Sequence, residues 1–115
     1  MSYDIDIGCK SFNYTSNVSR LFYDHIPATG SCRGGLHALH GLTGKQAQPI
    51  LSEAFERIHD THMQLWDGHA VGEPEFCERY DPANGWGSAV GGLIFLARIM
   101  AACAQCPRCK VRVDA

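Results

Sequence analysis

The chain has 115 residues, 45% of them hydrophobic and 19% charged, and this composition predicts one folded domain over residues 1–115. Ten basic and twelve acidic residues leave a net charge of −2, which disfavours non-specific binding to nucleic acid and polybasic docking to a membrane. The first residues lack a secretory signal, and the longest apolar run, Ala89 to Ala104, contains Arg98 and is short for a bilayer span. We therefore expect a cytoplasmic protein whose six cysteines are mostly free thiols.

The first 27 residues predict a strand followed by a helix. Tyr3–Gly8 alternates polar and apolar residues, which is typical of a short strand with one buried side. Thr15 or Ser16 can cap the helix that follows, and Pro27 ends it because proline disfavours helical geometry in the preceding residue. The apolar residues of this segment share one helical face: Val18, Leu21, Phe22 and Ile26.

The middle of the chain predicts a loop, a short helical turn closed by Gly41, and then the longest helix, within residues 42–66. Thr43 and Gln46 have the spacing of a capping box, and Pro49 indicates that the regular helix begins close to it. The predicted buried stripe of this helix is continuous: Ala47, Ile50, Leu51, Ala54, Phe55 and Ile58.

The last third predicts a connection over residues 67–85, one more helix and a final strand. The connection includes a helical turn near Glu75–Tyr80 and a tight turn at residues 82–85. Residues 86–105 are apolar on nearly every side, which indicates a central helix, and Val111 alternates with Val113 as in a strand. We expect an α+β fold in which about three main helices pack with a small sheet that pairs the N-terminal and C-terminal strands.

Several stretches together resemble a known family: "MSYDI", "NYTSNVSRLFY", "GLTGKQAQPIL", "DPANGWGSAVGGLIFLARIMAAC" and "PRCKVRV". This pattern is similar to that of a family of small uncharacterised proteins found in bacteriophages and bacterial genomes. The resemblance implies a phage or prophage accessory protein in the cytoplasm of a bacterial host, with no established activity. Cysteine is usual in that family at Cys103, whereas Cys106 and Cys109 depart from its pattern.

Three cysteines near the C-terminus, Cys103, Cys106 and Cys109, have the Cx2Cx2C spacing of a half metal site. A structural zinc or an iron–sulfur cluster needs a fourth ligand, which Cys9, Cys32, Cys77 or a histidine would have to supply. No second Cx2C is present, so we expect no metal and no other cofactor. A zinc-stabilised interaction module remains an alternative, whereas two histidine pairs, at residues 37 and 40 and at residues 59 and 62, are expected to lie on polar faces or in loops.

A thiol enzyme is the second alternative. Cys32 lies among glycines beside Arg33, which can favour a thiolate, and His37 or His25 could act as its base. The sequence places neither histidine near Cys32, so we expect no enzyme.

Two polar stretches, each predicted just before a helix, form the candidate ligand site: Asn13, Tyr14, Thr15, Asn17, Asn84 and Trp86. Helix starts have unpaired N–H groups and a partial positive charge, which suit an anion or a carbonyl. The same residues also have routine structural uses, as caps, in a turn and in the core. Both interpretations remain open at this point.

The function that we expect is that of a non-catalytic phage or prophage accessory binding protein. It would antagonise host defence by binding a host defence protein or by sequestering a small polar, nucleotide-like signal. A homodimer is a further open prediction, because the last helix is apolar on more sides than three helices can cover.

Overall fold

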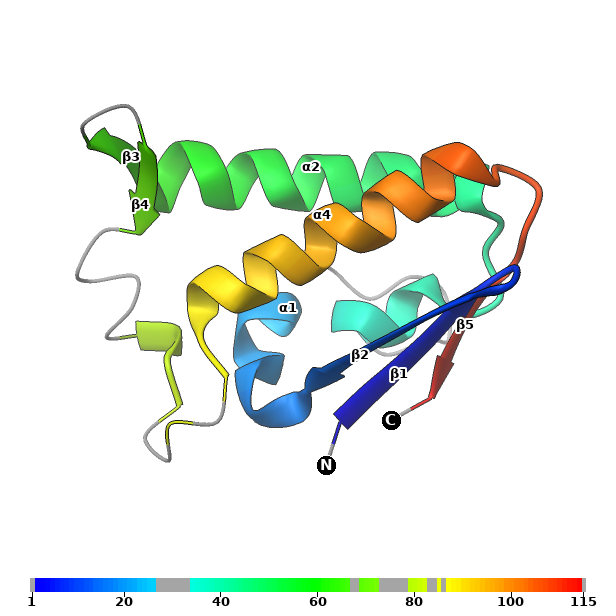
Figure 1. Cartoon of the computed structure of the whole chain (residues 1–115), viewed down its shortest axis with the longest axis horizontal. Helices are drawn as coiled ribbons and strands as arrows, with labels where there is room; N and C mark the ends of the chain where they lie inside the picture. Colours follow the sequence, from blue (N-terminus) through cyan, green and yellow to red (C-terminus); the bar gives the residue numbers. More distant parts are fainter. Residues whose placement is uncertain are drawn as a thin grey trace.

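The computed structural model describes residues 2–26, 34–66, 69–72, 79–82, 85 and 87–114, with the backbone alone for residues 61–66 and 69–72. Figure 1 shows two long helices beside a small sheet, and the fold class is α+β as predicted. No helix in these ranges is long and apolar enough to cross a membrane. The elements in chain order are β1 (Ser2–Ile7), β2 (Lys10–Thr15), η1 (Ser16–Val18), α1 (Ser19–His25), η2 (Gly35–Leu39), α2 (Gly44–His62), β3 (Met63–Trp66), β4 (His69–Gly72), α4 (Ala89–Gln105) and β5 (Val111–Asp114).

The predicted pairing of the two terminal strands is confirmed. β1 is the central strand of an antiparallel sheet with the order β2-β1-β5, and the two ends of the chain lie side by side (Figure 1). Ile5 is opposite Val113 and Ile7 is opposite Val111, so the buried faces of both strands coincide. These four side chains form the base of the hydrophobic core.

Strand β2 was not predicted. The segment that was interpreted as the approach to a helix pairs with β1 along its whole length, so Asn13 and Tyr14 are strand residues and not helix-start residues. The two strands are joined by the two-residue turn Gly8–Cys9, where Gly8 has a φ of 63°. Glycine adopts such an angle readily, which suits the tight turns of hairpins. The predicted cap at Thr15 is present at the start of the short helix η1. There the Thr15 hydroxyl accepts from the N–H of Asn17 at 3.2 Å.

The first helical segment agrees with its predicted face. Val18, Leu21, Phe22 and Ile26 are all buried. Helix α1 ends at His25, and Ile26 is extended with a φ of −117°. This is the conformation expected of a residue that precedes proline.

Helix α2 has the predicted capping box but different ends. The N–H of Thr43 donates to the Gln46 side chain at 3.0 Å, and the N–H of Gln46 donates to the Thr43 hydroxyl at 3.3 Å. The amides of Gly44 and Lys45 donate to carbonyls of the α4–β5 link, at 2.7 and 2.9 Å. Because these partners satisfy the first turn, the helix begins at Gly44 and includes Pro49, so the predicted start near Pro49 is wrong.

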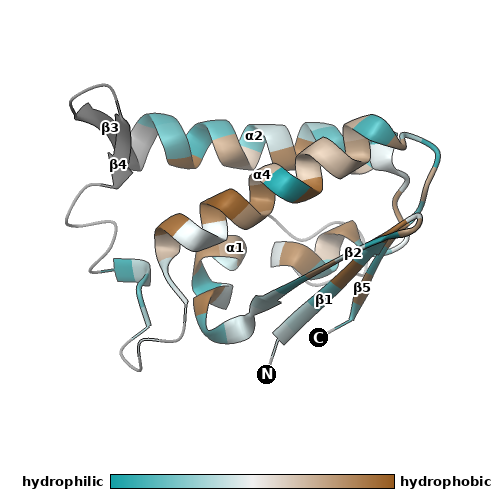
Figure 2. Ribbon diagram, in the orientation of Figure 1, coloured by the Kyte–Doolittle hydropathy of each residue, from teal (hydrophilic) through white to brown (hydrophobic). Residues whose placement is uncertain are grey.

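The far end of α2 also differs from the prediction. The helix ends at His62, and the chain continues into the β3–β4 hairpin (Figure 1). The predicted stripe is nevertheless the buried face, and in Figure 2 the side of α2 toward α4 is the apolar one. Four of its residues are fully buried and two are half-buried: Ala47, Leu51, Ala54 and Ile58, then Ile50 and Phe55.

Helix α4 packs against α2 on one side and against the sheet on another, as its apolar sequence predicted. It is not covered all round. Ile94 is 53% exposed, and Arg98, Ala101 and Gln105 are exposed at the spacing of one helical face. We call these four residues the open stripe of α4. Its buried residues are Ala89, Gly92, Leu93, Phe95, Leu96, Ile99, Ala102 and Cys103.

Candidate functional site

A hollow of about 220 Å³ lies where β2 meets the open stripe of α4. Tyr14 and Phe95 form its aromatic floor, with ring centroids 5.4 Å apart and planes inclined by 24°. The hollow is lined by Asn13, Tyr14, Gly91, Ile94, Phe95 and Arg98. It therefore joins part of the first predicted polar stretch to the C-terminal helix.

Tyr14 also connects β2 to the start of α4. Its hydroxyl donates to the Ser88 carbonyl and accepts from the Ser88 N–H, both at 3.0 Å. Ser88 is the N-cap of α4, and its side chain accepts from the N–H of Gly91 at 2.9 Å. The Tyr14 hydroxyl thus serves as a structural link between the first predicted polar stretch and the N-cap of α4.

The other predicted ligand residues have separate positions. Thr15 caps η1, and its methyl group lies where a side chain at Gly87 would have to stand. Asn17 contributes its backbone N–H to that cap. Asn84 and Trp86 lie outside the described residues.

Asn13 uses its side chain within the sheet. The amide nitrogen donates to Oδ1 of Asp4 at 2.6 Å, directly across the β1–β2 pair. Ser11 donates to Asp6 in the same way, also at 2.6 Å. These bonds pair both carboxylates of β1. The polar groups of β2 that remain to be considered are the backbone N–H and C=O groups at its outer edge.

The backbone of Ser11 and Asn13 points outward from that edge. A two-residue turn makes Ile7 and Lys10 a hydrogen-bonded pair, and bonded pairs alternate along antiparallel strands. Phe12 and Tyr14 therefore bond to β1, while the N–H and C=O of Ser11 and Asn13 face away. No backbone partner is present for these outward groups within the described ranges.

The opposite edge of the sheet is covered. The N–H of Val111 donates to the Leu42 carbonyl at 2.7 Å, and its carbonyl accepts from Gly41 at 2.8 Å. The N–H of Val113 donates to Nδ1 of His40 at 3.0 Å. As far as the described residues go, the sheet thus has one covered edge, β5, and one open edge, β2.

Arg98 supplies the positive charge of the hollow. It is exposed and lies one helical turn beyond Ile94 on the open stripe. Among the residues that the structure describes, no carboxylate is within ion-pair distance of its guanidinium. An exposed apolar side chain next to an uncompensated cation is a combination suited to an acidic partner with some apolar surface.

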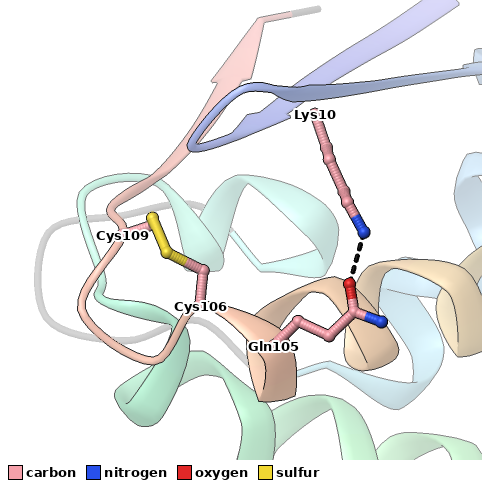
Figure 3. Close-up of a disulfide and its surroundings, with 4 residues drawn as sticks. All are labelled: Lys10, Gln105, Cys106 and Cys109. Carbon is pink, nitrogen blue, oxygen red and sulfur yellow. Dashed lines mark hydrogen bonds between the residues drawn. A yellow bond between two sulfur atoms is a disulfide. The ribbon is translucent and has the colours of Figure 1, made fainter.

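The C-terminal cysteines form a disulfide between Cys106 and Cys109 (Figure 3). Cys103 is buried in α4, and burial raises the pKa of its thiol. Within the described part of the chain no cluster of three or more histidine, cysteine or acidic side chains is arranged to hold a metal ion. The zinc alternative requires Cys106 and Cys109 as thiolates, whereas the structure has them bonded to each other.

The described histidines of the sequence-based alternatives each contact a different group. The His37 ring stands against Tyr3, 5.9 Å between centroids, and His40 accepts from β5. His59 stacks on Phe55. His25 is buried, with Nδ1 donating to the Leu21 carbonyl at 2.8 Å. Cys32 and the His62 side chain lie outside the described residues.

Comparison with protein-family models, with curated proteins and with solved structures finds no match to the chain. Sequence reasoning had selected Asn13 and Tyr14 but had missed Ile94, Phe95 and Arg98. These three residues lie in a predicted helix that is otherwise apolar. The one usable signal in its sequence was the charge of Arg98, which indicates an exposed side of the helix.

Proposed function

We propose that the chain is a non-catalytic accessory binding protein of the phage or prophage type, and that it binds an extended segment of a host protein. The segment adds to the open edge of β2 and covers the open stripe of α4. The observation that carries this proposal is the asymmetry of the sheet. Its β5 edge is hydrogen-bonded through both backbone groups of Val111 and the N–H of Val113, whereas no described residue bonds to the outer backbone of β2. A host defence protein is the partner that the phage-type hypothesis favours.

Strand addition fits the exposed backbone of β2. Ser11 and Asn13 offer two N–H and two C=O groups at the spacing that a neighbouring antiparallel or parallel strand requires. Natural sheets usually protect such an edge with charges, proline or a covering segment. On β2 the only charged residue is Lys10, at its first position, where it donates to the Gln105 side chain.

The hollow favours a protein side chain over a nucleotide. Its volume of about 220 Å³ is below the roughly 300–1,000 Å³ usual for small-molecule sites, and it is open to solvent. A strand added beside β2 directs alternate side chains over α4. One apolar side chain would cover Ile94, and one carboxylate would reach Arg98.

A second copy of this chain fits less well at the same edge. Antiparallel pairing of two β2 strands places both α4 helices on the same face of the continuous sheet. The two Arg98 guanidinium groups would then lie on neighbouring surfaces without a compensating carboxylate in the described residues. An acidic segment at the same edge would instead place a negative charge next to Arg98. The partner that we propose therefore carries negative charge.

Capture from lysate of a bacterial host tests the proposal with a matched pair of variants. Asn13→Pro removes an outward N–H without removing a β1–β2 hydrogen bond, whereas Asn13→Ala keeps that N–H and loses the same side chain. We expect a host protein that the wild type and Asn13→Ala retain and that Asn13→Pro binds at least about tenfold more weakly, equivalent to about 1.4 kcal/mol.

The same experiment distinguishes the alternatives. Equal capture by both Asn13 variants would show that the edge is not the binding surface. A nucleotide released by denaturing the protein after incubation with host metabolite extract, and retained by Asn13→Pro as well, would favour signal binding instead. Circular dichroism and the melting temperature of each variant show whether the fold is intact.

A further inference from the structure

Three cysteines line one hollow at the end of the sheet where β1 turns into β2. The Cys106–Cys109 disulfide closes the link between α4 and β5. Cys9 is a free, exposed thiol in the β1–β2 turn. All three cysteines line one hollow of about 300 Å³, together with Gly8, Lys10 and Gln105.

Gly8 brings the turn and the disulfide together. A Cβ atom built at Gly8 would lie 2.9 Å from the Cys109 sulfur and 3.9 Å from the Cys106 sulfur. Only a residue without a side chain allows the backbone next to Cys9 to approach the disulfide this closely. Register supports the same juxtaposition, because Ile7, at the end of β1, is paired with Val111, two residues after Cys109.

We propose that Cys9, Cys106 and Cys109 form an intramolecular thiol–disulfide exchange site. The Cys9 thiolate attacks the Cys106 sulfur, a Cys9–Cys106 bond forms and the Cys106–Cys109 bond breaks. The electron pair leaves on Cys109, which takes up from solvent the proton that Cys9 released. The reaction has one thiol and one disulfide on each side, so it needs no external oxidant or reductant.

Local charge sets the direction of attack. Cys109 borders a second hollow, of about 490 Å³, in which the cations of Lys110 and Arg112 outnumber the carboxylate of Asp6. Cys106 is the C-cap of α4, at the negative end of the helix dipole. Cations favour a departing thiolate and a helix C-terminus disfavours one, so Cys109 is the leaving group.

Lys10 follows Cys9 directly in the chain and lines the same hollow. Its ammonium group donates to Oε1 of Gln105, the residue before Cys106 (Figure 3). Exchange would tie the hairpin turn to the end of α4 and release Cys109 at the surface. The site would thus couple the first and last segments of the fold to the thiol state of their surroundings.

Cys109→Ser tests the site by removing the leaving group. After incubation with oxidised glutathione, alkylation and peptide mapping, we expect a Cys9–Cys106 cross-link as the main product. Cys9 capped by glutathione or alkylated, with no cross-link, would overturn the proposal. Faster cross-linking of Cys9 to Cys109 in the Cys106→Ser variant would overturn the direction of attack.

A wild-type arm keeps the test independent of variant folding. The oxidised wild-type protein is quenched with acid, alkylated and mapped, and we expect molecules in which Cys109 is alkylated and Cys9 is linked to Cys106. If Cys9 is found only as an unlinked thiol, no exchange occurs. The buried Cys103 reports on folding, because it stays unmodified under native labelling when the core is intact.

Discussion

The Tyr14 hydroxyl and the Ser88 backbone exchange two hydrogen bonds of 3.0 Å, and this pair joins the edge strand β2 to the first residue of the α4 cap. The link positions the floor of the hollow, because Tyr14 also stacks on Phe95, which lies seven residues after Ser88 in α4.

Tyr14→Phe should therefore destabilise the fold while preserving the aromatic stack. The change leaves the Ser88 N–H without its partner, whereas the Ser88 carbonyl still accepts from the N–H of Gly92 at 2.9 Å. We expect a cost of about 1–2 kcal/mol in the free energy of unfolding. Urea unfolding followed by circular dichroism measures this difference. An unchanged midpoint would show that solvent replaces the Tyr14 hydroxyl at no cost.

Gly87→Ala should cost more stability than Gly85→Ala. Both glycines have positive φ angles, 89° and 75°, so alanine costs about 1–2 kcal/mol at either position. A Cβ at Gly87 would in addition collide with the Thr15 methyl group, whereas no described residue lies within 4 Å of a Cβ at Gly85. Thermal unfolding of the two variants compares them directly, and equal melting temperatures would contradict the close packing of Gly87 on η1.

Tyr3 should make the fold sensitive to alkali. Burial raises the pKa of Tyr3 above 10.0, although its hydrogen bond to Ser19, 2.9 Å long, acts in the opposite direction. The pKa of Tyr3 is higher in the folded state than in the unfolded state. The contribution of Tyr3 to the free energy of unfolding is therefore complete below the unfolded pKa and is lost as pH rises through the folded pKa. The hydroxyl-free variant Tyr3→Phe should consequently lose less stability than the wild type above about pH 10.

The measurement for Tyr3 is urea unfolding at neutral and alkaline pH, with tyrosinate absorbance recorded in parallel. Tyr80 is a matched comparison, since burial and its hydrogen bond to Asp24 raise its pKa too. A parallel fall of stability in the wild type, Tyr3→Phe and Tyr80→Phe would place the alkaline sensitivity in other groups.

Ile94→Lys and Arg98→Glu should weaken partner binding without weakening the fold. Ile94 is 53% exposed and Arg98 has no ion pair among the described residues, so each change should alter stability by less than about 0.5 kcal/mol. Arg98→Glu should raise the dissociation constant most at low ionic strength, since it opposes an acidic partner. Ala101→Lys, on the same stripe but outside the hollow, is the control. If the loss of affinity in Arg98→Glu does not depend on salt concentration, Arg98 does not bind the partner through its charge.

Much of the fold could be predicted because local patterns and burial agree. The alternating residues of the two terminal strands share one buried face, with Ile5 opposite Val113 and Ile7 opposite Val111. The Thr43–Gln46 capping box forms as its spacing predicted. Helix α2 starts earlier than Pro49 because carbonyls of the distant α4–β5 link satisfy its first amides. The Thr43–Gln46 box is a local signal for this start, whereas the bonds from the distant link follow only from the fold.

The candidate site was less predictable because β2 has an ambiguous sequence. Asn13 and Thr15 are common at helix starts, yet Phe12 and Tyr14 alternate with polar residues after a Gly–Cys turn, which also fits a hairpin. Ile94 appeared to be a core residue since every position around it is apolar except Arg98. The small sheet leaves that side of α4 open, which follows from topology and not from periodicity.

Amide hydrogen exchange of β2 tests the central claim most directly. In the purified chain the amides of Ser11 and Asn13 should exchange quickly, whereas that of Phe12, bonded to β1, and that of Val113, covered by His40, should be protected. The captured host partner should then protect Ser11 and Asn13. Protection of these two amides equal to that of Phe12 in the purified chain, or no gain in protection on partner binding, would contradict the account.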